Sequence, residues 1–300
     1  MASSHFSSVV VIESLPSGDL RTGRRLREDI EVHNAFHQRG LSVEFAAADT
    51  AERFWGCLAH VLQDANTRAD YPLLHIESHG SVDTKGLVLA DGSFVGWDQL
   101  KPVLTAINVA TRCNLFVALA ACYGAYLGQI ILPTDRAPLW GMLAPTESAK
   151  PHDLLGNFFA FYTTLVASLD GDRSLSALIA AESRAANYYF VSAEGFFKKA
   201  YANYLAQHSS EKAYYRRAKG MRVRLREMGV RKRPTVFELQ QKLRATERPS
   251  FDKYHKAFFM IDLYPENAGR FPVRFDEIIK EARALTTRST GRAQESARAG

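Results

Sequence analysis

The sequence predicts an α/β fold, a mostly parallel sheet of about six strands with helices on both faces, followed by a helical C-terminal extension. Apolar runs of strand length alternate with amphipathic segments of helix length over about the first 195 residues, and the pattern beyond them is helical. Strands that alternate with helices build parallel sheets covered on both faces. We therefore expect an α/β domain at residues 1–195, a basic helical extension at 196–285 and a small, polar, disordered tail at 286–300.

Each expected strand is a short apolar run bounded by turn residues. The first, at residues 8–13, is rich in β-branched residues, which favour buried strands. Two short apolar runs within residues 86–95 are joined through Asp91-Gly92, a strong signal for a hairpin. The remaining strands are expected at residues 41–45, 73–79, 115–122, 139–144 and 188–192.

Helices are expected where apolar residues recur at helical spacing. The first, at residues 24–38, places Leu26 and Ile30 on one face and ends before Gly40, since glycine is common just past helix C-termini. Residues 252–264 are less regular and fit either a helix or a strand. Further helices are expected at residues 49–66, 97–108, 125–130, 153–169, 174–187, 193–207, 210–228 and 235–245.

The composition is that of a globular protein, with 46% hydrophobic and 23% charged residues and a net charge of +6. Three cysteines, Cys57, Cys113 and Cys122, are too few and too scattered for a disulfide framework or a zinc site. No apolar run approaches the length that spans a bilayer, and the first residues lack the pattern of a secretory signal. We therefore expect a cytosolic, cytoplasmic protein without a membrane partner.

Two of the strands end in reactive side chains that are followed by glycine. One leads into His79-Gly80 and the other into Cys122-Tyr123-Gly124. Side chains at the C-terminal ends of parallel strands face the crevice where α/β proteins bind ligands, so neighbouring strands would bring His79 and Cys122 face to face. A histidine within reach of a thiol can take its proton, and the thiolate is the nucleophile.

Two further features would assist such a nucleophile. The expected helix at residues 125–130 begins just after Cys122, and a helix N-terminus favours a thiolate. Gly80 lets a backbone N–H approach a substrate carbonyl, because no Cβ is in the way. We expect the amides of Gly80 and Cys122 to form an oxyanion hole, which typically contributes a few kcal/mol.

Three side chains in these stretches have alternative interpretations. Cys122 taken alone is more typical of a buried structural cysteine, the commonest fate of a free cysteine, and its catalytic interpretation depends on His79-Gly80 and the strand context. Glu77 either orients His79 or satisfies a buried hydrogen-bond donor. His75 shares a strand face with both and is expected to be a packed core histidine.

The residues around Cys122 carry a family resemblance. Ala120-Ala121-Cys122-Tyr123-Gly124 fits the frame of the caspase signature Q-A-C-[RQG]-G, with Ala120 in place of Gln and Tyr123 at the variable position. His79 lies 43 residues upstream of Cys122, where caspases have a histidine about 50 residues upstream. Together with the hairpin after His79-Gly80, these motifs resemble the caspase-like (clan CD) cysteine peptidases, most closely the bacterial CHAT branch, over about residues 8–195. The resemblance implies a caspase-like three-layer fold and endopeptidase activity through His79 and Cys122, with no metal or organic cofactor.

The same resemblance implies a protein substrate, a possible regulatory partner protein and a role as an effector in bacterial defence or cell death. Caspases bind acidic P1 side chains through an arginine after the first strand, and Arg21 occupies a similar place. By the same analogy, Ala144-Pro145-Thr146-Glu147 lines the cleft. The acid that metacaspases place two residues before the nucleophile is replaced by Ala120, which leaves Asp83, Asp91 or Glu147 as candidates and the P1 preference open.

The extension has a basic block of its own. Residues 212–244 contain twelve Lys or Arg against Glu227 and Glu238. The block fits a solvated amphipathic helix, a docking site for an acidic partner, or a phosphate-binding surface in which Tyr214 and Tyr215 interleave with cations, although no known nucleic-acid motif accompanies it. The main alternative function is therefore a non-catalytic interaction module whose extension binds an acidic partner or nucleic acid. An amidase or transpeptidase with the same two residues is a third.

Overall fold

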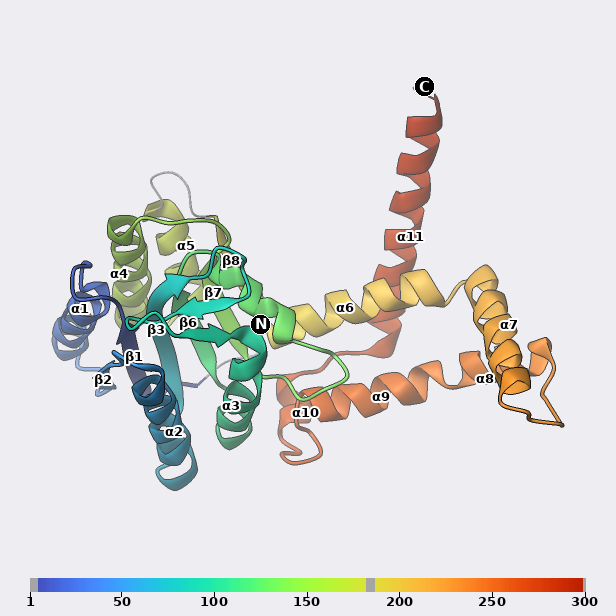
Figure 1. Ribbon diagram of the computed structural model, residues 1–300, viewed down its shortest axis with the longest axis horizontal. Helices are drawn as coiled ribbons and strands as arrows, with labels where there is room; N and C mark the ends of the chain where they lie inside the picture. The colour runs from blue at the N-terminus through green and yellow to red at the C-terminus, as the bar shows by residue number, and fades with distance from the viewer. Residues whose placement is uncertain (1–4, 182–186, 299–300) are drawn as a thin grey trace. The chain divides into compact units, whose positions relative to one another are not determined.

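The computed structural model describes residues 5–181 and 187–298 and confirms the α/β fold with a mostly parallel sheet (Figure 1). Six strands follow one another across the sheet in the order β2-β1-β3-β6-β7-β8, and a short hairpin is attached to β3. All pairings along this path are parallel except that of β7 with β8 at the edge. The strands span Ser8–Ser14 (β1), Ser42–Ala47 (β2), Pro72–Gly80 (β3), Phe116–Ala120 (β6), Gly141–Pro145 (β7) and Tyr188–Ser192 (β8).

The strand order reverses between β1 and β3. The chain passes from β1 out to β2 and then returns across β1 to form β3 on its other side. In open α/β sheets, ligands bind in the crevice outside the carboxyl ends of the strands at such a reversal. The loop after β1 and the end of β3 therefore lie where this fold is expected to bind a ligand.

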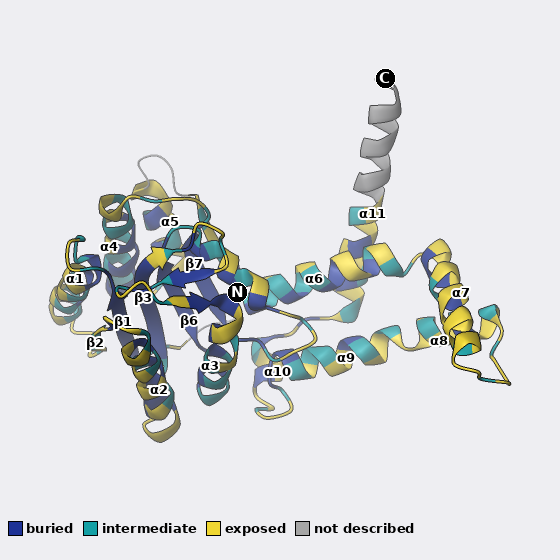
Figure 2. Cartoon of the chain, viewed as in Figure 1, coloured by how far each residue is buried: buried dark blue, intermediate teal, exposed yellow. Residues whose placement is uncertain are grey.

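Helices cover both faces of the sheet, which gives three layers (Figure 1). On one face, α4 (Pro151–Ser168) packs between α1 (Thr22–Phe36) and α5 (Gly171–Ala181), and on the other α2 (Ala51–Thr67) packs against α3 (Trp97–Ala110). Every residue of β1, β6 and β7 is buried, as Figure 2 shows by the dark strands between partly exposed helices. The continuous apolar runs of the sequence reflect this double coverage.

The expected hairpin is confirmed. Strands β4 (Gly86–Val88) and β5 (Phe94–Gly96) pair antiparallel, and β4 pairs with the last residues of β3. Gly92 has a φ of +82°, a left-handed conformation that glycine adopts without a steric penalty. The hairpin extends the sheet just beyond His79.

The residues from Glu194 onward, with Pro133–Arg136, form a second compact unit. Aromatic rings fill its interior: Phe197 contacts Phe251 and Phe258, and Phe259 stacks on Phe271 with ring centroids 4.5 Å apart. None of the described helices is long and apolar enough to span a membrane. The helices of this unit are α6 (Ala193–His208), α7 (Glu211–Glu227), α8 (Val236–Ala245), α9 (Glu247–Phe258), α10 (Asn267–Arg270) and α11 (Phe275–Arg298).

The stretch at 252–264, which fits either a helix or a strand by sequence, is helical as far as Phe258, within α9. Residues 286–298, expected to be disordered, continue α11. Of the helix expected at 174–187, residues 174–181 lie in α5, and residues 182–186 lie outside the described residues.

Candidate functional site

The loops after β1, β3 and β6 leave the sheet at one edge. Glu13 of β1 pairs with Glu77 of β3, which pairs with Ala120 of β6. Since the three strands are parallel neighbours, the residues that follow them meet at their common carboxyl edge. The expected adjacency of the strands that carry His79 and Cys122 is thereby confirmed.

Gly80 brings the end of β3 into contact with the backbone of Cys122. A Cβ built on Gly80 would lie 1.7 Å from the carbonyl oxygen of Cys122 and 2.7 Å from its carbonyl carbon. Real Cβ atoms do not approach backbone this closely, so a residue without a Cβ is required here. Since His79 directly precedes Gly80, this contact sets the two predicted catalytic residues side by side along the backbone.

Asp19, in the loop after β1, contacts the imidazole of His79. His79 Nε2 lies 2.7 Å from Asp19 Oδ2, and the two side chains are 51% and 38% exposed. An ionised carboxylate only accepts hydrogen bonds, so Nε2 carries the proton and Nδ1 is the basic nitrogen of the neutral ring. Asp19 is absent from the expected site residues, although the strand-end argument applies equally to the segment after β1.

The Cys122 thiol lies against the loop that follows β7. Ala149 N–H donates to Cys122 Sγ at 3.5 Å, Ser148 Oγ is 3.6 Å from the sulfur and Ala149 O is 3.7 Å from it. The side chain is partly exposed, and a donated N–H stabilises negative charge on sulfur. Ser148 and Ala149 belong to a loop whose sequence carries no sign of this contact.

Tyr123 turns the chain sharply after Cys122. Its φ of +58° is left-handed, and its N–H donates to the carbonyl oxygen of Glu147 at 3.1 Å. The N–H of Tyr123 is therefore already hydrogen-bonded to the loop after β7. The same hydrogen bond fixes that loop next to the thiol.

The expected α-helix after Cys122 is a 3₁₀ helix, η1, which spans Gly124–Ile130. Gly124 and Gly128 lower the α-helix propensity of this segment, which explains the tighter and less regular form. Aligned peptide dipoles accumulate in regular α-helices, so the expected contribution of a helix N-terminus to a thiolate is small here.

The four residues expected to line the cleft divide into two pairs. Ala144 and Pro145 are buried in β7. Thr146 donates its N–H and its hydroxyl to Asn187 O, at 2.7 and 2.8 Å. The Glu147 side chain is exposed, and its carbonyl holds Tyr123.

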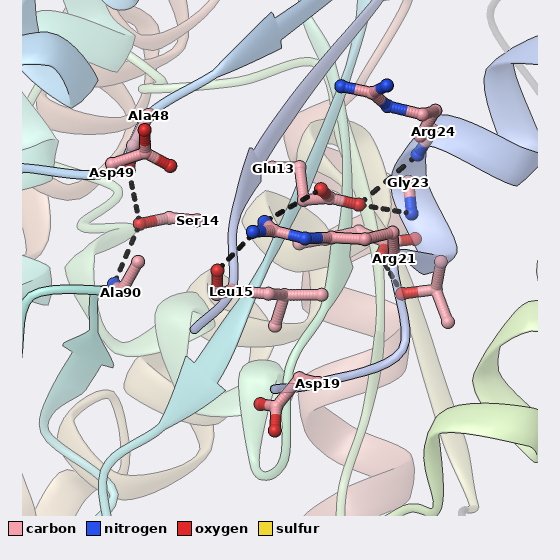
Figure 3. Close-up of polar contacts among 12 residues, drawn as sticks. Glu13, Ser14, Leu15, Asp19, Arg21, Gly23, Arg24, Ala48, Asp49 and Ala90 are labelled. Atoms are coloured by element: carbon pink, nitrogen blue, oxygen red, sulfur yellow. Dashed lines mark hydrogen bonds and ion pairs between the residues drawn. The ribbon is translucent and has the colours of Figure 1, made fainter. Parts of the chain in front are cut away.

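Arg21 is paired with a buried carboxylate. Its Nη1 lies 3.3 Å from Glu13 Oε1 and donates to Leu15 O at 2.9 Å, as the dashed lines in Figure 3 show. Glu13 Oε2 accepts the N–H groups of Gly23 and Arg24, at 2.9 and 3.2 Å, which are orphan donors at the start of α1. These bonds define the loop between β1 and α1, the loop that carries Asp19.

Glu77 contacts other side chains, so the carboxylate on His79 is that of Asp19. Glu77 Oε1 lies 3.1 Å from His75 Nε2, and its Oε2 accepts the hydroxyl of Thr22. His75 Nδ1 lies 3.1 Å from the hydroxyl of Tyr162 on α4. Burial, with a further contribution from Glu77, raises the pKa of Tyr162 well above its ordinary value, which keeps its hydroxyl protonated. The alternative reading of Glu77, a partner for buried donors, and the core reading of His75 fit these contacts.

The other acids considered for specificity have local partners. Ser81 and Lys85 hydrogen-bond to Asp83 and lower its pKa, and the N–H of Ser93 does so for Asp91. Both carboxylates therefore stabilise turns of the hairpin that follows His79.

One group of side chains among the described residues has the spacing of metal ligands. Glu44 of β2 and His60 and Asp64 of α2 each offer a ligand atom, all within 4.8 Å of one another. Asp64 also lies 3.5 Å from Arg68, a cation that opposes metal binding. Neither His79 nor Cys122 belongs to this group.

Comparison of the sequence with protein-family models and with curated proteins finds no match.

Proposed function

We propose that the chain is a caspase-like cysteine endopeptidase in which Cys122 is the nucleophile and His79 the general base and acid. The observation that supports this most strongly is the contact between Gly80 and the Cys122 backbone, since it joins the ends of two adjacent strands at the reactive residues. A structural cysteine would need neither a left-handed turn after it nor an exposed histidine beside it.

The proposed reaction begins when His79 Nδ1 takes the proton of the Cys122 thiol. The sulfur attacks the carbonyl carbon of the scissile peptide bond, forming an S–C bond and a tetrahedral oxyanion. The oxyanion collapses, the C–N bond breaks, and the imidazolium gives its proton to the leaving amine. His79 then removes a proton from water, which attacks the thioester and releases the acid product and the free thiol.

The amides of Gly80 and Cys122 are the proposed donors to the oxyanion. Ser81 N–H donates to Gly86 O on β4 at 2.9 Å. Successive N–H groups along a strand point to opposite sides, so the N–H of Gly80 is directed away from β4. Tyr123, whose amide is bound to Glu147, is not a candidate.

Asp19 is proposed as a positioning residue. By accepting Nε2–H, its carboxylate holds the ring in the tautomer that leaves Nδ1 free and stabilises the imidazolium once it forms. Glu13 already compensates the charge of Arg21, so the role we assign to Arg21 is to hold the loop of Asp19. An acidic P1 side chain would have to compete with Glu13.

The substrate we propose is a protein, and the location cytoplasmic. A role in bacterial defence or cell death, and a regulatory partner protein, rest on the family resemblance alone. We propose them as the setting in which such a peptidase would act.

The test is cleavage of a diverse peptide library by the purified full chain. We expect cleavage that is lost in Cys122→Ala and His79→Ala and retained in Cys57→Ala, a matched change of a half-buried thiol on α2. The residue before the cut reports the P1 preference. Cleavage that survives in Cys122→Ala contradicts the proposal, whereas no cleavage by any form favours the non-catalytic interaction module.

A further inference from the structure

One face of α7 carries a row of cations. The α7 row comprises Lys212, Arg216, Lys219, Arg222 and Arg226, all of them exposed. Their spacing of three or four residues places them along one side of a helix, over about 21 Å at 1.5 Å per residue. No acidic residue occurs from 212 to 226. We propose that the α7 row binds the phosphate backbone of nucleic acid, a function separate from the proposed peptidase site.

The charges of the row are uncompensated within the described part of the chain. None of its five side chains forms an ion pair there, whereas Arg244 of α8 pairs with Glu211 at the start of α7. Five like charges on one helix face repel one another, and a polyanion relieves that repulsion. The row therefore has the electrostatic character of a binding surface.

The opposite side of α7 is firmly held, so the row is presented on a rigid support. Ala213, Tyr214 and Ala218 are buried, and α7 packs against α8. Burial and a hydrogen bond to Glu247 raise the pKa of Tyr214 to about 12, so its hydroxyl stays protonated at the base of the helix.

The end of α7 is also well defined. Val230 N–H donates to Leu225 O, Gly229 N–H donates to Arg226 O, both at 3.0 Å, and Gly229 has a φ of +73°. This pattern is a Schellman motif, which ends a helix without fraying. The cations keep their spacing up to Arg226.

Phosphate backbone fits this row better than an acidic protein surface does. Three of its five cations are arginines, whose planar guanidinium forms paired hydrogen bonds with phosphate oxygens. Tyr215 is 53% exposed on the same face, where an aromatic ring can stack on a base. Protein interfaces are instead depleted of lysine, which supplies the other two cations of the row.

The experiment is a fluorescence anisotropy titration of the full chain with a labelled DNA duplex of about 20 base pairs and a single-stranded RNA of similar length. For five phosphate contacts we expect affinity for the duplex to fall with salt with a log–log slope of about −4.5. In the triple variant Arg216→Gln, Arg222→Gln, Arg226→Gln, we expect the magnitude of this slope to fall by about three. We also expect the affinity at low salt to fall at least about tenfold.

The matched control removes three charges elsewhere, in Arg53→Gln, Arg68→Gln, Arg173→Gln, whose side chains are 66%, 70% and 75% exposed. Affinity within about twofold of the unchanged protein supports the proposal, provided that circular dichroism shows both variants folded. An equal loss in the control assigns binding to net charge and overturns it. Absence of binding to either nucleic acid would also overturn the proposal. So would tighter α7-dependent binding of a polyglutamate peptide, because that result would assign the row to acidic proteins.

Discussion

Gly80 is the single residue on which the geometry of the candidate site depends most. In Gly80→Ala the added methyl group would overlap the Cys122 carbonyl, and backbone must move to make room. We expect the free energy of unfolding to fall by about 1–3 kcal/mol, together with loss of peptidase activity. Thermal and chemical denaturation measure the first effect.

Gly56→Ala is the control for that change, since nothing lies within 4 Å of a Cβ at Gly56, in the helix α2. There alanine should raise the free energy of unfolding by about 0.5–1 kcal/mol, because it restricts the unfolded chain and suits a helix. Equal changes in the free energy of unfolding at the two glycines would contradict the close contact between Gly80 and the Cys122 backbone.

Asp19 is the residue whose role is most specific to catalysis. We expect Asp19→Asn to lower kcat/KM about tenfold, a moderate effect because solvent screens a half-exposed pair. Asp19→Glu should restore part of the activity, since it returns the carboxylate. Asp49→Asn, which removes a carboxylate paired with Arg53, should leave kcat/KM unchanged. Activity that is the same in Asp19→Asn and the unchanged protein would remove Asp19 from the mechanism.

At the scale of elements, a buried chain of polar side chains joins β3 to two helices. Thr22 on α1, Glu77 and His75 on β3, and Tyr162 on α4 are hydrogen-bonded in sequence and all buried. Such a network fixes β3, the strand that carries His79, because each member would be costly to leave unsatisfied.

Removing one hydroxyl from that network should be costly. Tyr162→Phe leaves His75 Nδ1 without its partner, and we expect the free energy of unfolding to fall by about 1–3 kcal/mol. Tyr126→Phe, at a tyrosine that is 39% exposed, should change it by less than about 0.5 kcal/mol. Denaturant titration compares the two, and a neutral Tyr162→Phe would mean that His75 finds another partner.

Elements with strong local patterns were predictable from the sequence, and contacts made in three dimensions were not. The strands that lead to His79 and Cys122 and the Asp-Gly hairpin follow from apolar runs and turn residues, although β6 ends at Ala120, two residues before Cys122. The contacts of Asp19 and Ser148 depend on where two loops pass over the sheet edge, which no local pattern encodes. Residues 286–298 are small and polar and by composition are expected to be disordered, but the helix that begins at Phe275 continues through them.

At the scale of the whole molecule, the chain combines an α/β unit with a helical unit that has its own aromatic core. Within that core, His255 stacks on Phe251 and its Nε2–H donates to Phe271 O at 3.0 Å. Burial lowers the pKa of His255 below its ordinary value of about 6.5.

This shift predicts how the stability of the helical unit depends on pH. Below about pH 6.5 the histidine of the unfolded chain binds a proton, whereas burial opposes protonation of His255 in the folded chain. The stabilising contribution of neutral His255 is therefore complete above about pH 6.5 and is lost as the pH falls through the folded-state pKa. We expect the unfolding temperature to decline from pH 7 to 5, and to decline less in His255→Phe. His208→Phe, at a histidine outside this stack, is the control, and the same decline in all three proteins would contradict the assignment.

The measurement that tests the central claim most directly is the rate at which each cysteine is alkylated by iodoacetamide at neutral pH, resolved by mass spectrometry. Burial raises the pKa of Cys57, which makes it a slow internal reference. A Cys122 activated by His79 should react at least about tenfold faster than Cys57, and His79→Ala should remove that advantage. Equal rates at Cys122 and Cys57, or a Cys122 rate that His79→Ala does not change, would contradict the nucleophile–base pair.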